Sequence, residues 1–233
     1  MDLNLDPCSR CRNDDLTLSK LSINHHYNIR IDSVAKRRCR NFLLAIGRVA
    51  SAGASTFVSV ECDSCKQKDI HIQIVEREDD LVAFCPDDEL VDDGDLAAVA
   101  ERLIQGIEFE RMLILSSMPN CKFFSENRNE DEGFDLYHIT AQDNCPISRC
   151  PRLPIPNFIT GLAAAVFTSC YSSMIPAWVY VSVVKNLSAI DAALSFKSVF
   201  SHHFDEKLEP TRDAVLASHF LLADCDKPLS VFI

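Results

Sequence analysis

The chain has 233 residues, of which 47% are hydrophobic and 24% charged, a balance typical of a folded protein long enough to bury a sizeable core. Its 34 acidic residues outnumber its 23 basic ones, which gives a formal net charge of −11. Because this charge repels nucleic-acid phosphates and anionic lipid headgroups, we expect no nucleic-acid or membrane partner. A protein partner that offers Lys or Arg around its binding site would be attracted instead.

The chain contains 11 cysteines, a number that would suit a secreted disulfide scaffold. However, residues 1–15 carry charges and no apolar stretch of the kind found in secretory signals. We therefore expect a reducing compartment, the cytoplasm and secondarily the nucleus. Most thiols lie in apolar runs and are predicted to pack as small hydrophobes, among them Cys39, Cys85, Cys170 and Cys225.

The chain divides into three parts by composition. Residues 1–36 are polar and irregular, so we predict a disordered or peripheral N-terminal extension. Residues 37–226 are predicted to form an α/β domain, and residues 227–233 a C-terminal tail. The basic cluster at 36–40 is interpreted as a solvated flank of the first strand rather than a nuclear address.

Short apolar runs predict the strands. Residues 41–47 (NFLLAIG) form a continuous apolar run that ends at a glycine, which indicates a strand buried on both faces. In residues 70–75, isoleucines alternate with polar residues, which indicates one exposed face. Further strands are predicted at 57–60, 81–84, 111–116 and 177–184.

Helical periodicity appears between several of these strands. The acidic stretch 87–95 leads into an amphipathic helix at 96–108, with Asp95 as its N-cap, and complements the helix dipole. This stretch lacks the ligand spacing of a calcium loop. Helices are also predicted at 159–173, 189–202 and 211–223. The alternation predicts a single α/β domain with a mostly parallel β-sheet flanked by helices.

One uncharged segment is long enough to span a bilayer, since no charged residue lies between Arg152 and Lys185. Pro154, Pro156 and Pro176 interrupt it, and its apolar period changes from helical to extended near Pro176. We therefore predict a buried helix, a turn and a strand here rather than a transmembrane helix.

Motifs for catalysis are missing from the sequence. It has six glycines and none of the Gly-rich loops that bind phosphate or the strand-turn-helix motif of serine hydrolases. The adjacent pairs His25-His26 and His202-His203 point in different directions and are predicted to be surface or capping histidines. We expect no enzyme activity and no cofactor. A small α/β enzyme remains an alternative, and it requires a concave pocket with convergent polar groups.

A second alternative is a zinc-stabilised interaction module. Two C-x-x-C units, Cys8/Cys11 and Cys62/Cys65, offer four thiolates that could enclose Zn²⁺ tetrahedrally. Fifty residues separate the two units, whereas zinc knuckles of this kind are usually separated by about 15–20 residues.

The chain ends on Val231, Phe232 and Ile233, after Pro228 has stopped any helix. These apolar residues could form a closing strand on the domain. They could equally dock into a partner, with the Phe232 ring and the terminal carboxylate entering one pocket together.

Several segments resemble the proteasome assembly chaperone 1 family. They are FLLAIG at 42–47, which leads into small residues ending at Phe57-Val58, and MLILS at 112–116. The most specific is PNFITGLAAAVFTSCYSSMIPAWVYVSVV from residue 156, followed by FKSVF at 196–200. The resemblance covers most of residues 40–200 in order.

This resemblance implies a non-catalytic subunit that forms a heterodimer with proteasome assembly chaperone 2. It also implies binding to α subunits on the outer face of the 20S α-ring, through a C-terminal hydrophobic-Tyr-any tail. Val231 matches the hydrophobic position and Ile233 supplies the carboxylate, whereas Phe232 replaces Tyr. Phenylalanine keeps the ring but loses a hydroxyl hydrogen bond, typically worth ~0.5–1.5 kcal/mol.

Overall fold

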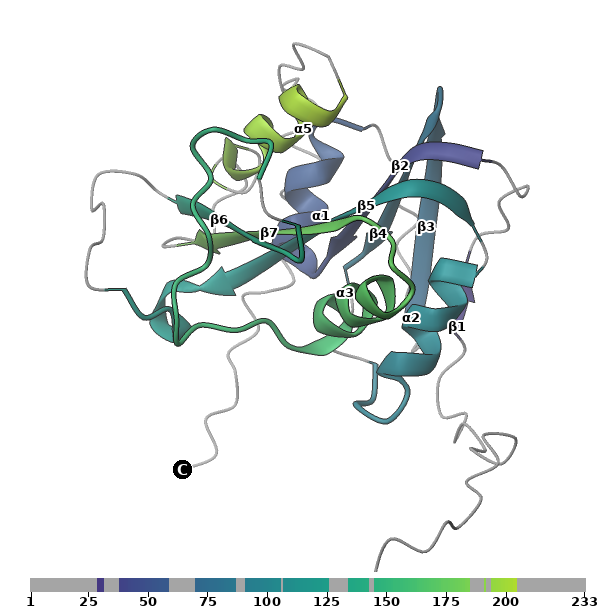
Figure 1. Cartoon of the computed structure of the whole chain (residues 1–233), viewed down its shortest axis with the longest axis horizontal. Helices are drawn as coiled ribbons and strands as arrows, with labels where there is room; N and C mark the ends of the chain where they lie inside the picture. The colour runs from purple at the N-terminus through teal and green to yellow at the C-terminus, as the bar shows by residue number, and fades with distance from the viewer. Residues whose placement is uncertain are drawn as a thin grey trace, which may run out of the picture.

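The computed structural model describes residues 29–31, 38–58, 70–86, 91–105, 107–125, 134–142, 145–184, 191 and 194–204. Within these residues the chain forms a seven-stranded sheet with helices on both faces (Figure 1). The strand order is β1-β3-β4-β2-β5-β7-β6. The pairs β1–β3, β2–β4, β2–β5 and β5–β7 are parallel, and β3–β4 and β6–β7 are antiparallel. This confirms the predicted single α/β domain with a mostly parallel sheet flanked by helices.

The strands are β1 (Ile29–Ile31), β2 (Arg38–Ile46), β3 (Ile70–Arg77), β4 (Asp80–Cys85), β5 (Glu108–Pro119), β6 (Phe134–Thr140) and β7 (Ala177–Val184). The helices are α1 (Arg48–Ser55), α2 (Leu96–Gln105), α3 (Gly161–Ser172) and α5 (Lys197–His203), with a 3₁₀ turn at Asn120–Lys122. β1 lies within the predicted N-terminal extension and forms an edge of the sheet. The helix predicted at 211–223 lies outside the described residues.

Three adjacent strands, β2, β5 and β7, are buried on both faces over much of their length, as the continuous apolar run at 41–47 predicts for β2. All eight residues of β7 are buried, as are residues 41–46 of β2 and 112–115 of β5. Because successive side chains of a strand point to opposite faces, these strands supply two separate cores. Both faces of the sheet therefore need a cover of helices.

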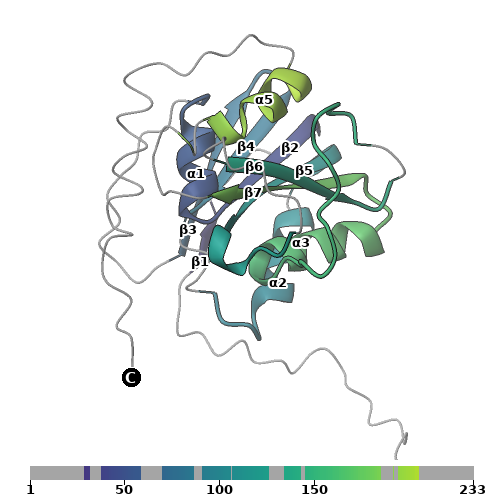
Figure 2. The same ribbon diagram turned by 90° about the vertical axis from the view of Figure 1, so that its left-hand side faces the viewer.

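Two pairs of helices provide that cover, one pair on each face (Figures 1 and 2). Residues of α2 and α3 pack with one set of strand side chains, which includes Phe42, Leu44, Met112, Ile114 and Val179. Residues of α1 and α5 pack with the alternate set, which includes Leu43, Ala45, Leu113, Leu115 and Tyr180. Cys39, Cys85 and Cys170 are buried as predicted, and Cys225 lies outside the described residues.

The prediction of a strand at 57–60 is wrong for residues 57 and 58, the two of these residues that the structure describes. The chain from Arg48 to Ser55 forms α1, and Phe57 and Val58 follow it in a turn. Residues 49–55 of α1 are all buried, because its small side chains let the helix lie close to the sheet. The ring of Phe57 stacks on that of Phe200 of α5, with ring centroids 4.7 Å apart, which accounts for an apolar residue at this position.

The uncharged segment between Arg152 and Lys185 folds as predicted, into α3, a turn and the fully buried strand β7. α3 buries Leu162, Ala163, Val166 and Cys170 against the sheet. None of the helices in the described part of the chain reaches the length and apolar character needed to span a membrane.

The prediction of surface or capping histidines is wrong for His203, which is buried near the end of α5. Its Nε2 lies 2.8 Å from the hydroxyl of Tyr180 on β7, so a hydrogen bond joins this helix to the sheet. The amide of Asn41 on β2 also donates to the His203 carbonyl, at 3.3 Å. His202 is exposed, and His25 and His26 lie outside the described residues.

Gly47 turns β2 into α1, and its replacement tests this connection. Its φ of 84° and ψ of 161° lie in a region that is essentially restricted to glycine. We expect Gly47→Ala to lower the free energy of unfolding by about 1–3 kcal/mol, measured by urea denaturation. Gly94→Ala is the matched control, because that glycine lacks a positive φ and a Cβ there meets nothing within 4 Å. Equal stability of the two variants would contradict this account.

Burial of His203 makes stability depend on pH. Burial first, and then the charges of His202, Arg111 and Arg40, lower the pKa of His203 from 6.5 to about 3. Between these values the unfolded chain binds a proton that the native chain does not. His203 should therefore cost the native state about 1.4 kcal/mol per pH unit as the pH falls below 6.5.

This contribution is measured by comparing urea denaturation of the wild-type chain and His203→Gln from pH 7 to pH 4. Glutamine keeps a hydrogen-bonding group near Tyr180 but does not titrate, so its stability should fall less steeply with acidification. His202→Gln removes only one of the charges that lower this pKa, so it should flatten the slope less than His203→Gln does. A His203→Gln slope equal to that of the wild type would refute the assignment.

Candidate functional site

The predicted site residues fall outside the part of the chain that the structure describes. This holds for the tail, Val231, Phe232 and Ile233, and for the four cysteines of the zinc alternative, Cys8, Cys11, Cys62 and Cys65. Both assignments therefore stay predictions. The described residues contain three other features that bear on function: an apolar turn, the exposed end of α3, and a buried cluster of His and Cys.

Three large hydrophobic side chains are exposed together beside the start of α3. The exposed fractions are 94% for Ile155, 71% for Phe158 and 64% for Phe124. We call these three residues the apolar turn. Since soluble proteins rarely expose neighbouring large apolar side chains without a use for them, the apolar turn is a candidate protein-binding surface.

The side chain of Asn157 fixes the shape of the apolar turn. Its Oδ1 accepts a hydrogen bond from the backbone N–H of Phe124 at 2.7 Å. Its Nδ2 donates to the carbonyls of Phe124 and Pro154 at 2.7 and 2.8 Å. One amide group thus joins two segments that are about 30 residues apart in sequence. The exposed rings are presented on a hydrogen-bonded backbone, which lowers the ordering cost of binding.

A second exposed apolar site lies where α3 ends. Tyr171 is 62% exposed and Met174 90%. The N–H of Ile175 donates to the Cys170 carbonyl and that of Met174 to the Tyr171 carbonyl, at 2.9 and 3.1 Å. These are the two hydrogen bonds of a Schellman motif, in which the residue at the Met174 position is usually glycine. Met174 adopts the left-handed conformation, with φ of 58°.

A hollow of about 370 Å³ opens near the start of β5, at residues 108–110. Apolar side chains of α2, β5 and Ile175 line it together with Arg38, Glu108 and Glu110. Arg38 and Glu110 form an ion pair at 3.4 Å, in which both side chains are more than half exposed. This lining offers no nucleophile next to a base, so the hollow does not supply what the enzyme alternative requires.

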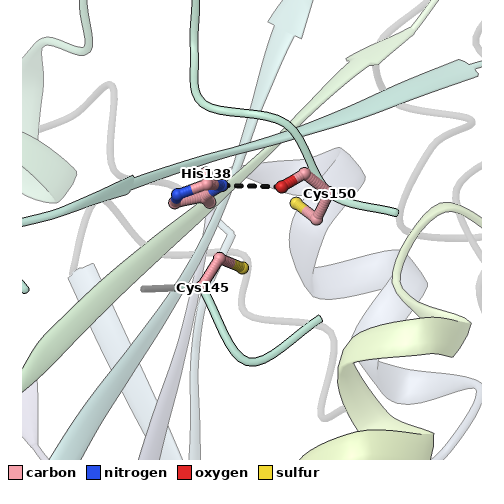
Figure 3. Close-up of side chains that lie close together, drawn as sticks. All are labelled: His138, Cys145 and Cys150. Atoms are coloured by element: carbon pink, nitrogen blue, oxygen red, sulfur yellow. Dashed lines mark hydrogen bonds between the residues drawn. The ribbon is translucent and has the colours of Figure 1, made fainter. Parts of the chain in front are cut away.

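The buried cluster lies beside the edge strand β6, on the same side of the sheet as α1 and α5. It consists of His138 from β6 and of Cys145 and Cys150 from the segment that follows (Figure 3). One imidazole nitrogen and the two Sγ atoms all lie within 4.8 Å of one another. His138 is directly opposite Tyr180 in the β6–β7 register, which places the Tyr180 side chain next to this group.

Backbone hydrogen bonds hold this segment against β6. The N–H of His138 donates to the Pro151 carbonyl, and the His138 carbonyl accepts from the N–H of Leu153, both at 2.9 Å. The Nδ1 of His138 lies 2.8 Å from the Cys150 carbonyl. We call residues 145–153 the edge clip, because they cover part of a strand that would otherwise expose its backbone groups.

Burial controls the ionisation of the groups around the edge clip. Desolvation raises the pKa of the Cys150 thiol well above its ordinary value of 9.0, and the neighbouring Cys145 raises it further. Desolvation likewise raises the pKa of the Tyr180 hydroxyl, again with contributions from Cys145 and Cys150. Burial therefore favours the protonated forms of the Cys150 thiol and the Tyr180 hydroxyl.

No site residue was predicted between residues 119 and 158, so the apolar turn and the cluster were both missed. Exposed Ile155 and Phe158 carry no periodic signal, because they lie in a turn. The spacing of His138, Cys145 and Cys150 matches none of the usual zinc motifs. The available signal was a histidine on a short strand followed by two cysteines in a proline-containing loop.

Solved structures with the same fold were found, although no family model and no curated protein matches the sequence. A protein of unknown function from Thermoplasma acidophilum has a TM-score of 0.60 at 12% identity, covering 93% of this chain and 94% of that one. PbaA of Pyrococcus furiosus, an archaeal homolog of proteasome-assembly chaperone, has a TM-score of 0.57 at 10% identity, covering 82% and 92%. The chain shares their fold.

PbaB of Pyrococcus furiosus, an archaeal proteasome activator, is a third such structure, with a TM-score of 0.52 at 10% identity. The match covers 82% of this chain and 92% of the PbaB chain. The block that most resembles proteasome assembly chaperone 1, from residue 156 onwards, contains Phe158 of the apolar turn, α3 and β7. Of these three structural neighbours, one is a homolog of proteasome-assembly chaperone and one a proteasome activator, each at 10% identity to this chain.

The left-handed residue at the end of α3 provides a test of this region. Replacing Met174 by glycine removes a backbone cost of about 1–2 kcal/mol, so Met174→Gly should raise the free energy of unfolding by about 1 kcal/mol. The measurement is urea denaturation, with Ser172→Gly as the control. Ser172 lies inside the last helical turn, where glycine should lower stability by about 0.5 kcal/mol. A Met174→Gly variant that is less stable than the wild type would contradict the assignment of strain.

Proposed function

We propose that this chain is a non-catalytic chaperone for assembly of the 20S proteasome, which binds α subunits while the ring forms. The observation that carries this proposal is the fold that it shares with PbaA over 82% of its length. The sequence resemblance to proteasome assembly chaperone 1 was drawn from different information, the order of its residues. The two point to the same kind of protein.

The distribution of polar and apolar groups supports a binding role. In the described part of the chain, buried side chains fill the space between the sheet and the helices on each face. The apolar turn, by contrast, presents three large hydrophobic side chains to solvent beside the block of strongest resemblance. We assign this surface to a heterodimer partner, proteasome assembly chaperone 2, because a neighbouring subunit would bury these side chains.

The tail is assigned to the α-ring. Val231 and Phe232 supply apolar area, and the carboxylate of Ile233 supplies a charge that a lysine in the pocket would bind. The acidic net charge of −11 would speed the encounter with a basic rim. Since Phe232 lacks the hydroxyl group of tyrosine, we expect this tail to bind less tightly than a hydrophobic-Tyr-any tail.

Capture of 20S α subunits by the immobilised full-length chain tests the role of the tail. Deletion of Val231–Ile233 should abolish or strongly reduce capture, because the apolar side chains are lost and the terminal carboxylate then belongs to Ser230, three residues earlier. Phe232→Tyr should tighten binding roughly fivefold, the equivalent of about 1 kcal/mol for one hydrogen bond. Ser230→Ala is the matched control and should bind like the wild type.

The same capture with proteasome assembly chaperone 2 separates the two surfaces. Phe158→Ser should weaken heterodimer formation and leave the tail intact, whereas deletion of the tail should leave the heterodimer unchanged. Equal recovery of α subunits with and without Val231–Ile233 would disprove the role of the tail. Failure of the full-length heterodimer to bind any α subunit would disprove the proposed function as a whole.

A further inference from the structure

The geometry at the edge clip points to a metal site: we propose that His138, Cys145 and Cys150 bind one Zn²⁺ ion. The site is independent of the proposed chaperone role and of the four cysteines at 8, 11, 62 and 65. Its three donors, one imidazole nitrogen and two sulfurs, are the ligands that zinc prefers in proteins. They come from two segments, a strand and the loop that folds back over it.

The distances leave little rearrangement for binding. In a tetrahedral zinc site, bonds of about 2.0–2.3 Å place the ligand atoms roughly 3.3–3.8 Å from one another. Here the three atoms lie within 4.8 Å of one another. In Figure 3 the nitrogen on the side of the two sulfurs is Nδ1, the atom that is hydrogen-bonded to the Cys150 carbonyl. A contraction of about 1 Å would therefore complete the three-ligand set.

Binding through Nδ1 has a defined cost. A carbonyl oxygen can only accept, so Nδ1 carries the ring proton in the hydrogen bond to Cys150. In the zinc-bound form that proton moves to Nε2, and the Cys150 carbonyl loses this partner. The loss of one neutral hydrogen bond is small beside the free energy with which thiolate and imidazole ligands bind zinc.

The charges of the bound site balance. Zn²⁺ binding releases one proton from each thiol, and the two thiolates neutralise the two positive charges of the ion. A neutral complex suits a site in which His138 and Cys150 are buried. Cys145 is partly exposed, so a water molecule can reach the fourth tetrahedral position.

A bound ion would connect the edge clip to the sheet more firmly than hydrogen bonds alone. Residues 145–153 are attached to β6 by two backbone hydrogen bonds at His138 and by the bond from its Nδ1. From there the chain continues to Ile155 and Phe158 of the apolar turn. Zinc at the edge clip would thus stabilise the segment that leads to the proposed partner surface.

The test is metal content and affinity of the full-length chain, purified without chelator and then titrated with Zn²⁺ and Co²⁺. We expect one zinc per chain, and a Co²⁺ spectrum with the charge-transfer band of thiolate ligands. Cys145→Ser/Cys150→Ser and His138→Gln should each weaken Zn²⁺ binding by more than about 100-fold, the most that loss of a second-shell partner usually costs. Cys121→Ser, at an exposed cysteine, should bind like the wild type.

A readout on the unmodified chain covers variants that fail to fold. Zn²⁺ should slow alkylation of Cys145 by at least about tenfold and leave alkylation of the exposed Cys121 unchanged. Two results would overturn the proposal. One is zinc that disappears when Cys8, Cys11, Cys62 and Cys65 are replaced and persists in His138→Gln. The other is a chain that binds no Zn²⁺ or Co²⁺, including one whose mass shows a Cys145–Cys150 disulfide.

Discussion

The burial of β2, β5 and β7 on both faces is the constraint on which the rest of the structure depends. Three adjacent strands with side chains in two cores are stable only if helices cover each face. The small residues of α1 and α3 satisfy this requirement, because they let both helices lie close to the sheet. The hydrogen bond between His203 and Tyr180 then attaches α5 to the same face as α1.

Because helices cover both faces of these strands, the candidate binding features lie at the surface of the domain. With the interior filled, the features that could recognise another molecule lie at the β6 edge and at the ends of α3. The edge clip, the Met174 turn, and Ile155 and Phe158 of the apolar turn belong to the connection from β6 to β7, whereas Phe124 precedes β6. This connection contains the start of the block that resembles proteasome assembly chaperone 1. Structural neighbours such as PbaA show the shared fold, and the proposal of a chaperone role is based on this fold and on the sequence resemblance together.

The buried strands and the larger helices could be predicted from sequence, because burial on two faces leaves a continuous apolar run and burial on one helical face leaves a period. Residues 41–47 and 177–184 carry the first signal, and residues 96–105 the second. α1 could not be predicted, since its glycine and serines are weak helix formers and a helix buried along nearly its whole length has no polar face to set a period. Phe57 was assigned to a strand because aromatic and β-branched residues in a short run are typical of strands. In the structure its ring instead stacks on Phe200 after the end of α1.

The candidate sites were less predictable than the fold. His203 is buried because α5 places it against Tyr180, a contact between residues 23 positions apart. The cluster of His138, Cys145 and Cys150 forms only when residues 151–153 pair with β6. The apolar turn depends on Asn157, whose amide bonds to a residue 33 positions away. Such long-range contacts leave no periodic pattern in the sequence.

The central claim, a chaperone for 20S assembly, is tested most directly by the rate at which purified α and β subunits form complete 20S particles. With the full-length chain and proteasome assembly chaperone 2 present at equimolar amounts, α-ring intermediates should appear earlier and more 20S should form. An unchanged rate and yield, in a mixture in which the heterodimer itself has formed, would contradict the account.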